Sequence, residues 1–241
     1  MRASIWAVTA TYNEAENLPE LAAAFLALDR PPRLLIVDDS SPDGTGEIAE
    51  ELAAEHPGQF AVMHRPCKLG YASAHLLGIR HVLQRGAEVV VTLDADLSHD
   101  PAVIPTLLQR LQEADVVVGS RYVEGGATVN WGPDRRALSR TAGALVRLAS
   151  GLRVADPTGG FRAYRAPILR LAKYHRVRQR GYAFLSELLF RCVRAGGTVG
   201  EVPITFVDRR AGRSKLSRAI MVEAGLHLFS LAWRRITGWV P

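Results

Sequence analysis

Two aspartates one residue apart are the side chains of this sequence best suited to chemistry. Asp94 and Asp96 follow the apolar run 88–93 directly, and in an extended chain residues i and i+2 lie on one face. Two carboxylates on one face repel each other unless a cation lies between them. Oxygen ligands with waters suit Mg²⁺ or Mn²⁺, which commonly bridge to substrate phosphates. The spacing therefore predicts a divalent cation site at Asp94 and Asp96.

A third acidic residue in the same stretch has a different explanation. Asp100 precedes Pro101, and an aspartate followed by proline is a good helix start. We therefore interpret Asp100 as a helix cap. His99 is ambiguous, and we do not assign it as a metal ligand.

Polar clusters also follow three other apolar runs. They read TYNE at 11–14, DDSSPDGT at 38–45 and GSRY at 119–122. Ligands of parallel sheets bind beyond the carboxyl ends of the strands, where acidic side chains can accept hydrogen bonds from a nucleoside. The clusters therefore predict one site at one sheet edge. No GxGxxG follows the first strand and no GxxxxGK[ST] occurs, so dinucleotide-binding Rossmann and P-loop chemistry are unsupported.

Strands and helices that must position these residues alternate along the first half of the chain. Strands that are continuous apolar runs are typical of a parallel sheet covered on both faces. We predict an α/β fold with a mainly parallel central sheet and helices on both faces. The expected strands are 3–10, 33–37, 60–64, 88–93 and 115–119.

The second half of the chain is less regular. We expect a Gly-rich loop over 123–136, a helix over 137–150, a helix over 181–197 and a strand over 198–209. A basic loop then leads to the amphipathic segment 216–236. We divide the chain into a catalytic domain, 1–215, and a C-terminal helix, 216–241.

Charge and composition narrow the classes of partner. The 241 residues carry a net charge of +6, and the excess of basic residues lies late in the chain. Such an asymmetry indicates nucleic acid, a phosphorylated substrate or an anionic membrane surface. Binding of single-stranded nucleic acid would call for exposed aromatics between basic residues. The later aromatics instead occupy apolar periodic positions, so we predict no nucleic-acid partner.

Cysteine usage and hydropathy bear on the compartment. Cys67 and Cys192 form no CxxC pair, which fits a reducing cytosol. The N-terminus is too short in its apolar part for a signal peptide. No run reaches the roughly 18–20 apolar residues of a spanning helix. We therefore expect a protein of the cytoplasm or of the cytoplasmic face of the membrane.

The motifs in their order resemble those of family 2 glycosyltransferases, and more narrowly of polyprenol-phosphate (dolichol-phosphate) mannosyltransferases. The resemblance covers residues 5 to about 220. It implies a GT-A fold, a divalent cation, GDP-mannose as donor and a polyprenyl phosphate as acceptor. The motifs are TYNE, DDSSPDGT, KLGYASAHLLG, DADLSHDP, GSRY, DPTGGFRAY, FLSELLFR and EVPITFVDRRAGRSKLS.

Site residues follow from the resemblance, motif by motif. Asp94 and Asp96 would bind the cation, with Ser98 completing its shell through a water, and they would meet the diphosphate together with Ala95. The acceptor phosphate would lie at Arg121, Arg135 and Ser139, with Asp96 as the fourth catalytic residue. The nucleoside would contact Ala10, Tyr12, Glu14, Ile36, Asp38 and Asp39. The basic loop would close over the diphosphate through Arg209, Arg213 and Lys215.

Three questions stay open at this point. His75 stands where the family pattern places a tyrosine, so another donor, such as UDP-glucose, remains an alternative. Glu187 either pairs with an arginine near the acceptor pocket or acts as a base. The segment 219–233, with Arg218, Arg234 and Arg235 around it, either lies in the membrane interface as a peripheral contact or packs on the catalytic domain.

Overall fold

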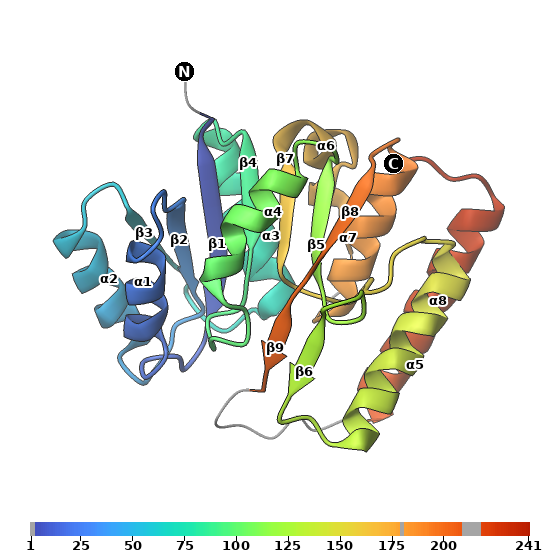
Figure 1. Cartoon of the computed structure of the whole chain (residues 1–241), viewed down its shortest axis with the longest axis horizontal. Coiled ribbons are helices and arrows are strands. Elements are labelled where there is room, and N and C mark those ends of the chain that lie inside the picture. The colour runs from blue at the N-terminus through green and yellow to red at the C-terminus, as the bar shows by residue number, and fades with distance from the viewer. Residues whose placement is uncertain (1–2, 179–180, 209–217) are drawn as a thin grey trace.

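A single large sheet forms the centre of the protein, whose computed structural model describes residues 3–178, 181–208 and 218–241 (Figure 1). Its strand order is β3 (Phe60–His64), β2 (Arg33–Asp38), β1 (Ile5–Thr11), β4 (Val89–Thr92), β7 (Arg162–Arg165), β5 (Val116–Ser120) and β8 (Val199–Pro203). Strand β7 runs antiparallel to β4 and β5, and the other neighbouring pairs are parallel. The predicted mainly parallel sheet is therefore confirmed.

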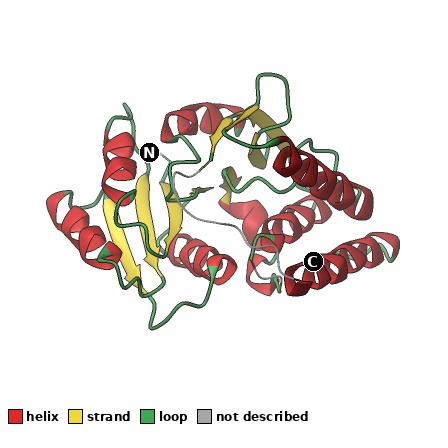
Figure 2. Cartoon of the chain, turned by 90° about the horizontal axis from the view of Figure 1, so that it is seen from below, coloured by secondary structure: helices red, strands yellow, loops and turns green. Residues whose placement is uncertain are grey.

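Helices cover both faces of this sheet, as the view from below shows (Figure 2). One face packs against α1 (Leu18–Leu26), α2 (Thr45–Glu55) and α4 (Ile104–Arg110). The other face packs against α3 (Tyr71–Gln84), α6 (Ala166–Leu171) and α7 (Ala183–Arg194), with α5 (Pro133–Ser150) and α8 (Arg218–Ile236) contributing at the outer end. Two short 3₁₀ turns are η1 (Pro101–Val103) and η2 (Tyr174–Arg176).

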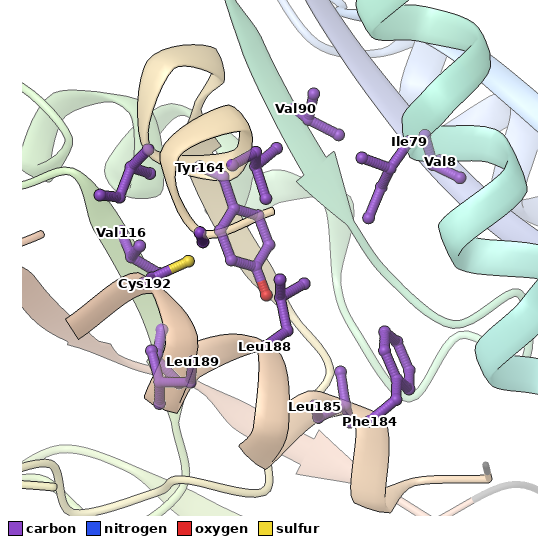
Figure 3. Packing of buried hydrophobic residues seen from close by; sticks show 14 of the residues in the cluster. Val8, Ile79, Val90, Val116, Tyr164, Phe184, Leu185, Leu188, Leu189 and Cys192 are labelled. Carbon is purple, nitrogen blue, oxygen red and sulfur yellow. The ribbon is translucent and has the colours of Figure 1, made fainter. Parts of the chain in front are cut away.

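Alternation along the strands builds these two cores. In β5, Val116 and Val118 face the α7 side while Val117 faces the α4 side, as the two-residue period of a strand requires. On α7, Leu185, Leu188, Leu189 and Cys192 recur at helical spacing and pack against Tyr164 and Val116 (Figure 3). Burial of an apolar side chain of this size contributes roughly 1.5–3 kcal/mol, so this stripe fixes α7 on the sheet.

The second half of the chain differs from the sequence prediction in two places. The expected loop 123–136 contains β6 (Ala127–Val129) and the first turn of α5, which begins at Pro133. The expected strand 198–209 is broken at Ile204, and its second part, β9 (Thr205–Val207), leaves the main sheet to pair with β6. This small second sheet carries the chain beyond the carboxyl edge of the main one (Figure 1).

The last helix packs on the protein along part of its surface. Helix α8 lies beside α5 (Figure 1), where Arg235 Nη1 donates to the carbonyl oxygen of Leu148 at 2.8 Å. Leu231 is buried in the core cluster that includes α7. None of the helices in the described part of the chain is long and apolar enough to cross a bilayer.

Candidate active site

The polar clusters meet where the strand order reverses direction. From β1 the chain passes to β2 on one side and later to β4 on the other, and ligands of such sheets bind at this switch point. A cavity of about 150 Å³ opens there. We call it the donor pocket, and its walls are Ala10, Thr11, Tyr12, Glu14, Asp39, Lys68, Gly70, Tyr71, Asp94, Ala95, Asp96 and Tyr182. The structure thus brings together seven of the predicted donor residues.

The two aspartates of the predicted cation site lie on a loop just beyond β4. The strand ends at Thr92, slightly earlier than predicted. Asp94 Oδ1 accepts a hydrogen bond from the Tyr71 hydroxyl at 2.6 Å, and the main-chain nitrogen of Asp94 donates to His99 Nδ1 at 3.0 Å. Asp96 Oδ1 accepts from the main-chain nitrogen of Ser98 at 3.1 Å. The loop therefore holds both carboxylates in place at the wall of the pocket.

Tyr71 is a donor to Asp94 at neutral pH. Burial, followed by the charge and hydrogen bond of Asp94, raises the pKa of Tyr71 well above its usual value. A side chain at Gly160 would crowd this pair, because a Cβ there would lie 3.0 Å from the Tyr71 hydroxyl oxygen. The second glycine of the DPTGG motif thus permits the close approach of the β7 entry turn to the acidic loop.

The donor set at this loop fits a divalent cation that shares its remaining ligands with a substrate. In the ranges that the structure describes, no group of three or more His, Cys, Asp and Glu side chains could hold a metal. Asp94 and Asp96 supply carboxylate oxygens alone, which suits Mg²⁺ or Mn²⁺ completed by phosphate oxygens and waters. Ser98 does not extend this set toward the pocket, since its hydroxyl is buried without a hydrogen-bond partner and does not line the cavity.

Asp39 organises the nucleoside side of the pocket. Its carboxylate accepts hydrogen bonds from the main-chain nitrogens of Leu69 and Gly70, at 3.1 and 2.8 Å, and forms a buried ion pair with Arg65. Across the pocket, Lys68 Nζ lies 3.5 Å from the centre of the Tyr12 ring. The loop before α3 is therefore locked to the end of β2, and it presents a cation to the pocket.

Two predicted donor residues, Ile36 and Asp38, do not line the pocket, so their contact with the donor stays a prediction. Ile36 is fully buried in the core beneath the sheet. Asp38 accepts hydrogen bonds from the Thr11 hydroxyl and from the main-chain nitrogen and hydroxyl of Ser41, and it lines a separate cavity with His64. Asp38, the last residue of β2, and Asp39, which follows it, therefore line two different cavities.

Glu14 and the TYNE motif are held by the acidic turn after β2. The main-chain nitrogen of Glu14 donates to Thr45 Oγ1 at 2.9 Å, and Thr45 in turn donates to Asp43. Burial alone would raise the pKa of Asp43, but its hydrogen bonds from Thr45 and Ala15 outweigh burial and lower it. Asp43 is therefore an anion that stabilises the turn, as expected for a turn residue.

Arg121 lies in a buried ion pair that the sequence prediction did not include. Its Nε and Nη2 donate to the two carboxylate oxygens of Asp156 at 2.6 and 2.7 Å. Burial alone would lower the pKa of Arg121, but the hydrogen bonds and charge of Asp156 outweigh it and raise the pKa. This fork geometry is the strong form of the pair. Asp156 of the DPTGG motif therefore fixes the guanidinium rigidly.

Arg135 and Ser139 lie beside Arg121 at the beginning of α5. The Arg135 guanidinium carbon lies 4.3 Å from the centre of the Trp131 ring, and that of Arg121 lies 5.5 Å from the same ring. Ser139 Oγ accepts from the Tyr122 hydroxyl at 2.7 Å. Arg135 is also ion-paired with Asp208, and 43% of its side chain is exposed. Arg121 and Arg135 are thus brought together at Trp131, and Ser139 is joined to Arg121 through Tyr122.

Phe206 and His99 join this basic group to the acidic loop. The centre of the Phe206 ring lies 5.4 Å from the ring centres of both His99 and Trp131. It lies 5.6 Å from the guanidinium carbon of Arg121. Burial lowers the pKa of His99 more than the charges of Asp94 and Asp96 raise it, so His99 is neutral and orients the loop through its hydrogen bond. The acidic loop at Asp94 and Asp96 and the basic group at Arg121 are therefore joined by one aromatic wall, formed by His99, Phe206 and Trp131.

Some site residues lie outside what the structure or the prediction covers. Arg209, Arg213 and Lys215 fall outside the described residues, so their predicted contact with the diphosphate stays a prediction. Sequence reasoning missed Lys68, Tyr71 and Asp156. Each belongs to a motif that was recognised, KLGYASAHLLG or DPTGGFRAY, but side chains that act through partners in distant segments carry no local signal.

Glu187 pairs with arginines, as one of its two predicted roles required. Its Oε1 accepts from Arg191 Nε at 2.8 Å and from Arg234 Nη1 at 2.9 Å. Burial alone would raise the pKa of Glu187, but these bonds outweigh it and lower the pKa. These partners lie on α7 and α8 and are not the acceptor arginines Arg121 and Arg135. An anionic carboxylate held by two arginines is not a general base.

His75 lies behind Tyr71 and does not line the donor pocket. Its ring stacks on Phe184, and both of its nitrogens are buried without a partner. His75 therefore contributes no atom to the wall of this pocket.

Buried His75 predicts a loss of stability in mild acid. Burial lowers the pKa of His75 to about 4, whereas the unfolded chain has its ordinary pKa of about 6.5. The unfolded state therefore binds the proton first as pH falls, and the free energy of unfolding should decrease by about 3 kcal/mol between about pH 6.5 and about pH 4. Urea unfolding measures this free energy at each pH. Across the window, the free energy of unfolding of His75→Leu should depend less on pH than that of the wild type. His175 is exposed, so His175→Leu should show the same dependence of the free energy of unfolding on pH as the wild type. The same dependence in all three proteins would contradict the prediction.

Comparison with known proteins identifies the class of enzyme. A family model described as glycosyl transferase family 2 matches residues 6–171. The chain belongs to glycosyl transferase family 2. The resemblance predicted from its motifs is confirmed, and the site is that of a glycosyltransferase.

Two curated relatives match this family 2 glycosyltransferase over most of its length. The undecaprenyl-phosphate mannosyltransferase of Micrococcus luteus is 44% identical over 214 residues, which cover 89% of this chain and 88% of that protein. The polyprenol monophosphomannose synthase of Mycolicibacterium smegmatis is 43% identical over 215 residues, which cover 89% of this chain and 81% of that protein.

Solved structures confirm the GT-A fold. Glucosyl-3-phosphoglycerate synthase from Mycobacterium tuberculosis, in complex with Mn²⁺, UDP and glucosyl-3-phosphoglycerate, has a TM-score of 0.66 at 19% identity, covering 99% of this chain and 81% of that chain. The same synthase with Mg²⁺ and UDP has a TM-score of 0.68 at 18% identity, and the match covers 99% of this chain and 80% of that chain. Those proteins bind a divalent cation on this fold.

Proposed function

We propose that this glycosyltransferase moves mannose from GDP-mannose to the phosphate of a polyprenyl lipid. The observation that carries the proposal is the placement of the acidic donor pocket and the Arg121–Arg135–Trp131 group on one aromatic wall. The first group suits a nucleotide sugar with a cation, and the second suits an anionic acceptor. The names of the two relatives at 43% and 44% identity support mannose and polyprenyl phosphate as substrates.

The acidic loop would serve the leaving group. Asp94 and Asp96 would hold Mg²⁺ or Mn²⁺, and the bound cation offsets the negative charge that develops on the departing diphosphate. Tyr71 keeps Asp94 oriented, and Lys68 adds a positive charge on the opposite wall. Preorganised charges of this kind contribute most when they need not move during the reaction.

The acceptor side needs positioning more than proton removal. A phosphate monoester has a second pKa of about 6, so it is largely a dianion at neutral pH. Arg135 would bind its oxygens in place of Asp208, with Ser139 beside it, while Asp156 keeps Arg121 fixed as a source of positive potential. A single displacement would invert the anomeric centre and give a β-linked product from an α-linked donor.

A transfer assay tests the proposal directly. The protein, a short polyprenyl phosphate and a divalent cation are incubated with GDP-mannose or UDP-glucose, each labelled in the sugar. We expect the label to enter the lipid fraction from GDP-mannose. Transfer from UDP-glucose alone would overturn the assignment of the donor.

We also propose that the exposed side of α5 and α8 contacts the membrane that carries the lipid. On α8, large apolar side chains recur at a helical spacing that places them on one face, and Ile236 among them is 81% exposed. Leu148 on α5 is 75% exposed. We call these residues the apolar face, which consists of Leu138, Leu145, Leu148, Leu226, Phe229, Trp233 and Ile236.

The two arginines at the end of α8 also contact the rest of the protein. Arg234 turns inward to Glu187 and Arg235 donates to the main chain of α5. One side of the helix packs on the protein, as one alternative required, and the other side is apolar and exposed, which supports the membrane interface as a proposal for that side. The side chain of Arg218 lies outside the described residues.

Removal of apolar area should weaken vesicle binding. The double variant Phe229→Ser/Trp233→Ser should bind anionic lipid vesicles about tenfold or more less tightly, because each ring contributes apolar area to the contact. Co-sedimentation with vesicles measures the partition. Leu26→Ser, which removes an exposed leucine on α1, should bind as the wild type does. Unchanged binding of the double variant would exclude this face as the contact.

A further inference from the structure

A second cavity, lined by cationic side chains, lies outside the active site. It has a volume of about 650 Å³ and opens between η2, α7 and the residues that follow α8. None of its lining residues belongs to the donor pocket. We call it the α7–α8 basic pocket, and the residues that matter here are Lys173, Arg176, Arg178, Arg191, Arg234 and Trp239.

Positive charge in this pocket exceeds the negative charge that faces it. Five of the lining side chains, one lysine and four arginines, are permanent cations, and His175 is a sixth basic group. The carboxylate of Glu187 lies behind them and binds two. Burial lowers the pKa of Arg191, and repulsion from Arg234 and Arg176 adds to that shift.

Arg191 has a buried hydrogen-bond donor that no acceptor among the described residues satisfies. Its side chain is only 3% exposed, its Nε donates to Glu187 and its Nη2 donates to the carbonyl oxygen of Arg176 at 2.8 Å. Its Nη1 is buried and has no hydrogen-bond partner within residues 3–178, 181–208 and 218–241. A buried donor without an acceptor is costly and rare in folded proteins. The pocket that Arg191 lines is therefore the place to expect an anionic acceptor.

Trp239 gives the pocket a rigid wall. The guanidinium carbons of Arg191 and Arg234 lie 4.9 and 4.8 Å from the centre of its ring. Stacking on an aromatic ring orients an arginine fork while leaving its edge for hydrogen bonds. Preorganised forks of this kind match the oxygens of phosphate, which they bind in pairs.

We propose that the α7–α8 basic pocket binds a phosphate group from outside the reaction, either as free phosphate or as the headgroup of a phospholipid. Its volume admits a phosphate with a small polar substituent. The exposed apolar side chain of Val240 is part of the lining, which favours a phosphate carried on a lipid. The inference does not depend on the proposed function, because none of these residues contributes to the catalytic site.

Tryptophan resonances distinguish this pocket from the active site. In full-length protein labelled with 5-fluorotryptophan, the ¹⁹F signal of Trp239 reports the pocket and that of Trp131 reports the acceptor side. Each signal is assigned from its Trp→Phe variant. Titration with inorganic phosphate at constant ionic strength should shift the Trp239 signal saturably. An equal shift with sodium chloride alone, or no shift with either phosphate or phospholipid vesicles, would overturn the proposal.

Variants of exposed arginines locate the binding. Arg176→Gln/Arg178→Gln removes two cations that line the pocket and leaves the buried contacts of Arg191 intact. It should weaken the phosphate affinity measured at Trp239 about tenfold or more, since each charge-assisted hydrogen bond is strong. Arg30→Gln/Arg33→Gln, which removes two exposed cations elsewhere, should leave it unchanged. Equal affinity in all three proteins would place the phosphate elsewhere and overturn the proposal.

Vesicles separate the two sources of phosphate. With phosphatidylglycerol vesicles, Arg176→Gln/Arg178→Gln should lose binding relative to Arg30→Gln/Arg33→Gln if a headgroup occupies the pocket. If vesicle binding is equal while the Trp239 titration differs, the ligand is free phosphate. Both outcomes support a phosphate site. The transfer assay is read separately, so a failure here leaves the proposed reaction untouched.

Discussion

Asp96→Asn is expected to lower kcat/KM for sugar transfer by roughly 1,000-fold while the protein stays folded. The asparagine keeps the size of the side chain and an acceptor for the Ser98 main-chain nitrogen. It removes the charge that would help to hold a divalent cation against a diphosphate. The loss should be accompanied by weaker cation binding, which titration calorimetry with Mn²⁺ in the presence of GDP measures.

Asp100→Asn is the matched control, since it removes one carboxylate from the same loop. Asp100 accepts a hydrogen bond from the main-chain nitrogen of Ala102 at 2.9 Å and caps the 3₁₀ turn η1. Its replacement should lower the free energy of unfolding by less than about 1 kcal/mol and leave kcat/KM near the wild-type value. An active Asp96→Asn enzyme, or an inactive Asp100→Asn enzyme with intact folding, would reverse the roles assigned to these residues.

Arg135→Gln is expected to raise the KM for the lipid phosphate about 100-fold and to leave the affinity for GDP-mannose unchanged. Arg135 is the partly exposed arginine of the acceptor group, and two charge-assisted hydrogen bonds to phosphate oxygens are worth roughly 3 kcal/mol together. Steady-state kinetics with the acceptor varied, and calorimetry with the donor, measure the two quantities separately.

Arg153→Gln supplies the control for charge alone. Arg153 is an exposed arginine that follows α5 at its far end, so its loss changes the net charge equally without touching Trp131. Its KM for the acceptor should stay within about twofold of the wild type, as expected of a surface substitution. A rise in KM for both variants would point to general attraction of the lipid surface, and a loss of donor affinity in Arg135→Gln would place this arginine in the donor pocket.

The local pattern of the sequence was sufficient for much of the fold. Continuous apolar runs separated by helical segments predict the strands of a parallel sheet, and β1, β2, β3 and β5 lie close to their expected positions. The antiparallel insertion of β7 was not predicted. Its four residues have no pattern that specifies direction, because direction depends on which neighbours it meets after more than sixty residues of intervening chain.

Residues at the ends of strands were predicted well because strand ends are a local property. Asp94, Asp96, Asp39 and Tyr12 each lie within three residues of the end of an apolar run, and all four line the donor pocket. Asp38 and Ile36 do not line it. The two-residue period of a strand predicts that adjacent residues point to opposite faces of the sheet. Only the packed sheet decides which of these faces lies at the pocket.

The sequence by itself determined the class of enzyme, the acidic pair and the set of arginines available to an acceptor. Only the tertiary structure decided how these charges are used: Arg121 is fixed by Asp156 from a segment 35 residues away, Glu187 is held by Arg234 from 47 residues away, and the exposed stripe of α8 is separated from its packed side. Hydrogen bonds and ion pairs between distant segments form only where folding brings the backbones of those segments close together. The local sequence pattern does not predict that proximity. For the same reason the α7–α8 basic pocket, assembled from η2, α7 and the end of the chain, is visible only in the folded protein.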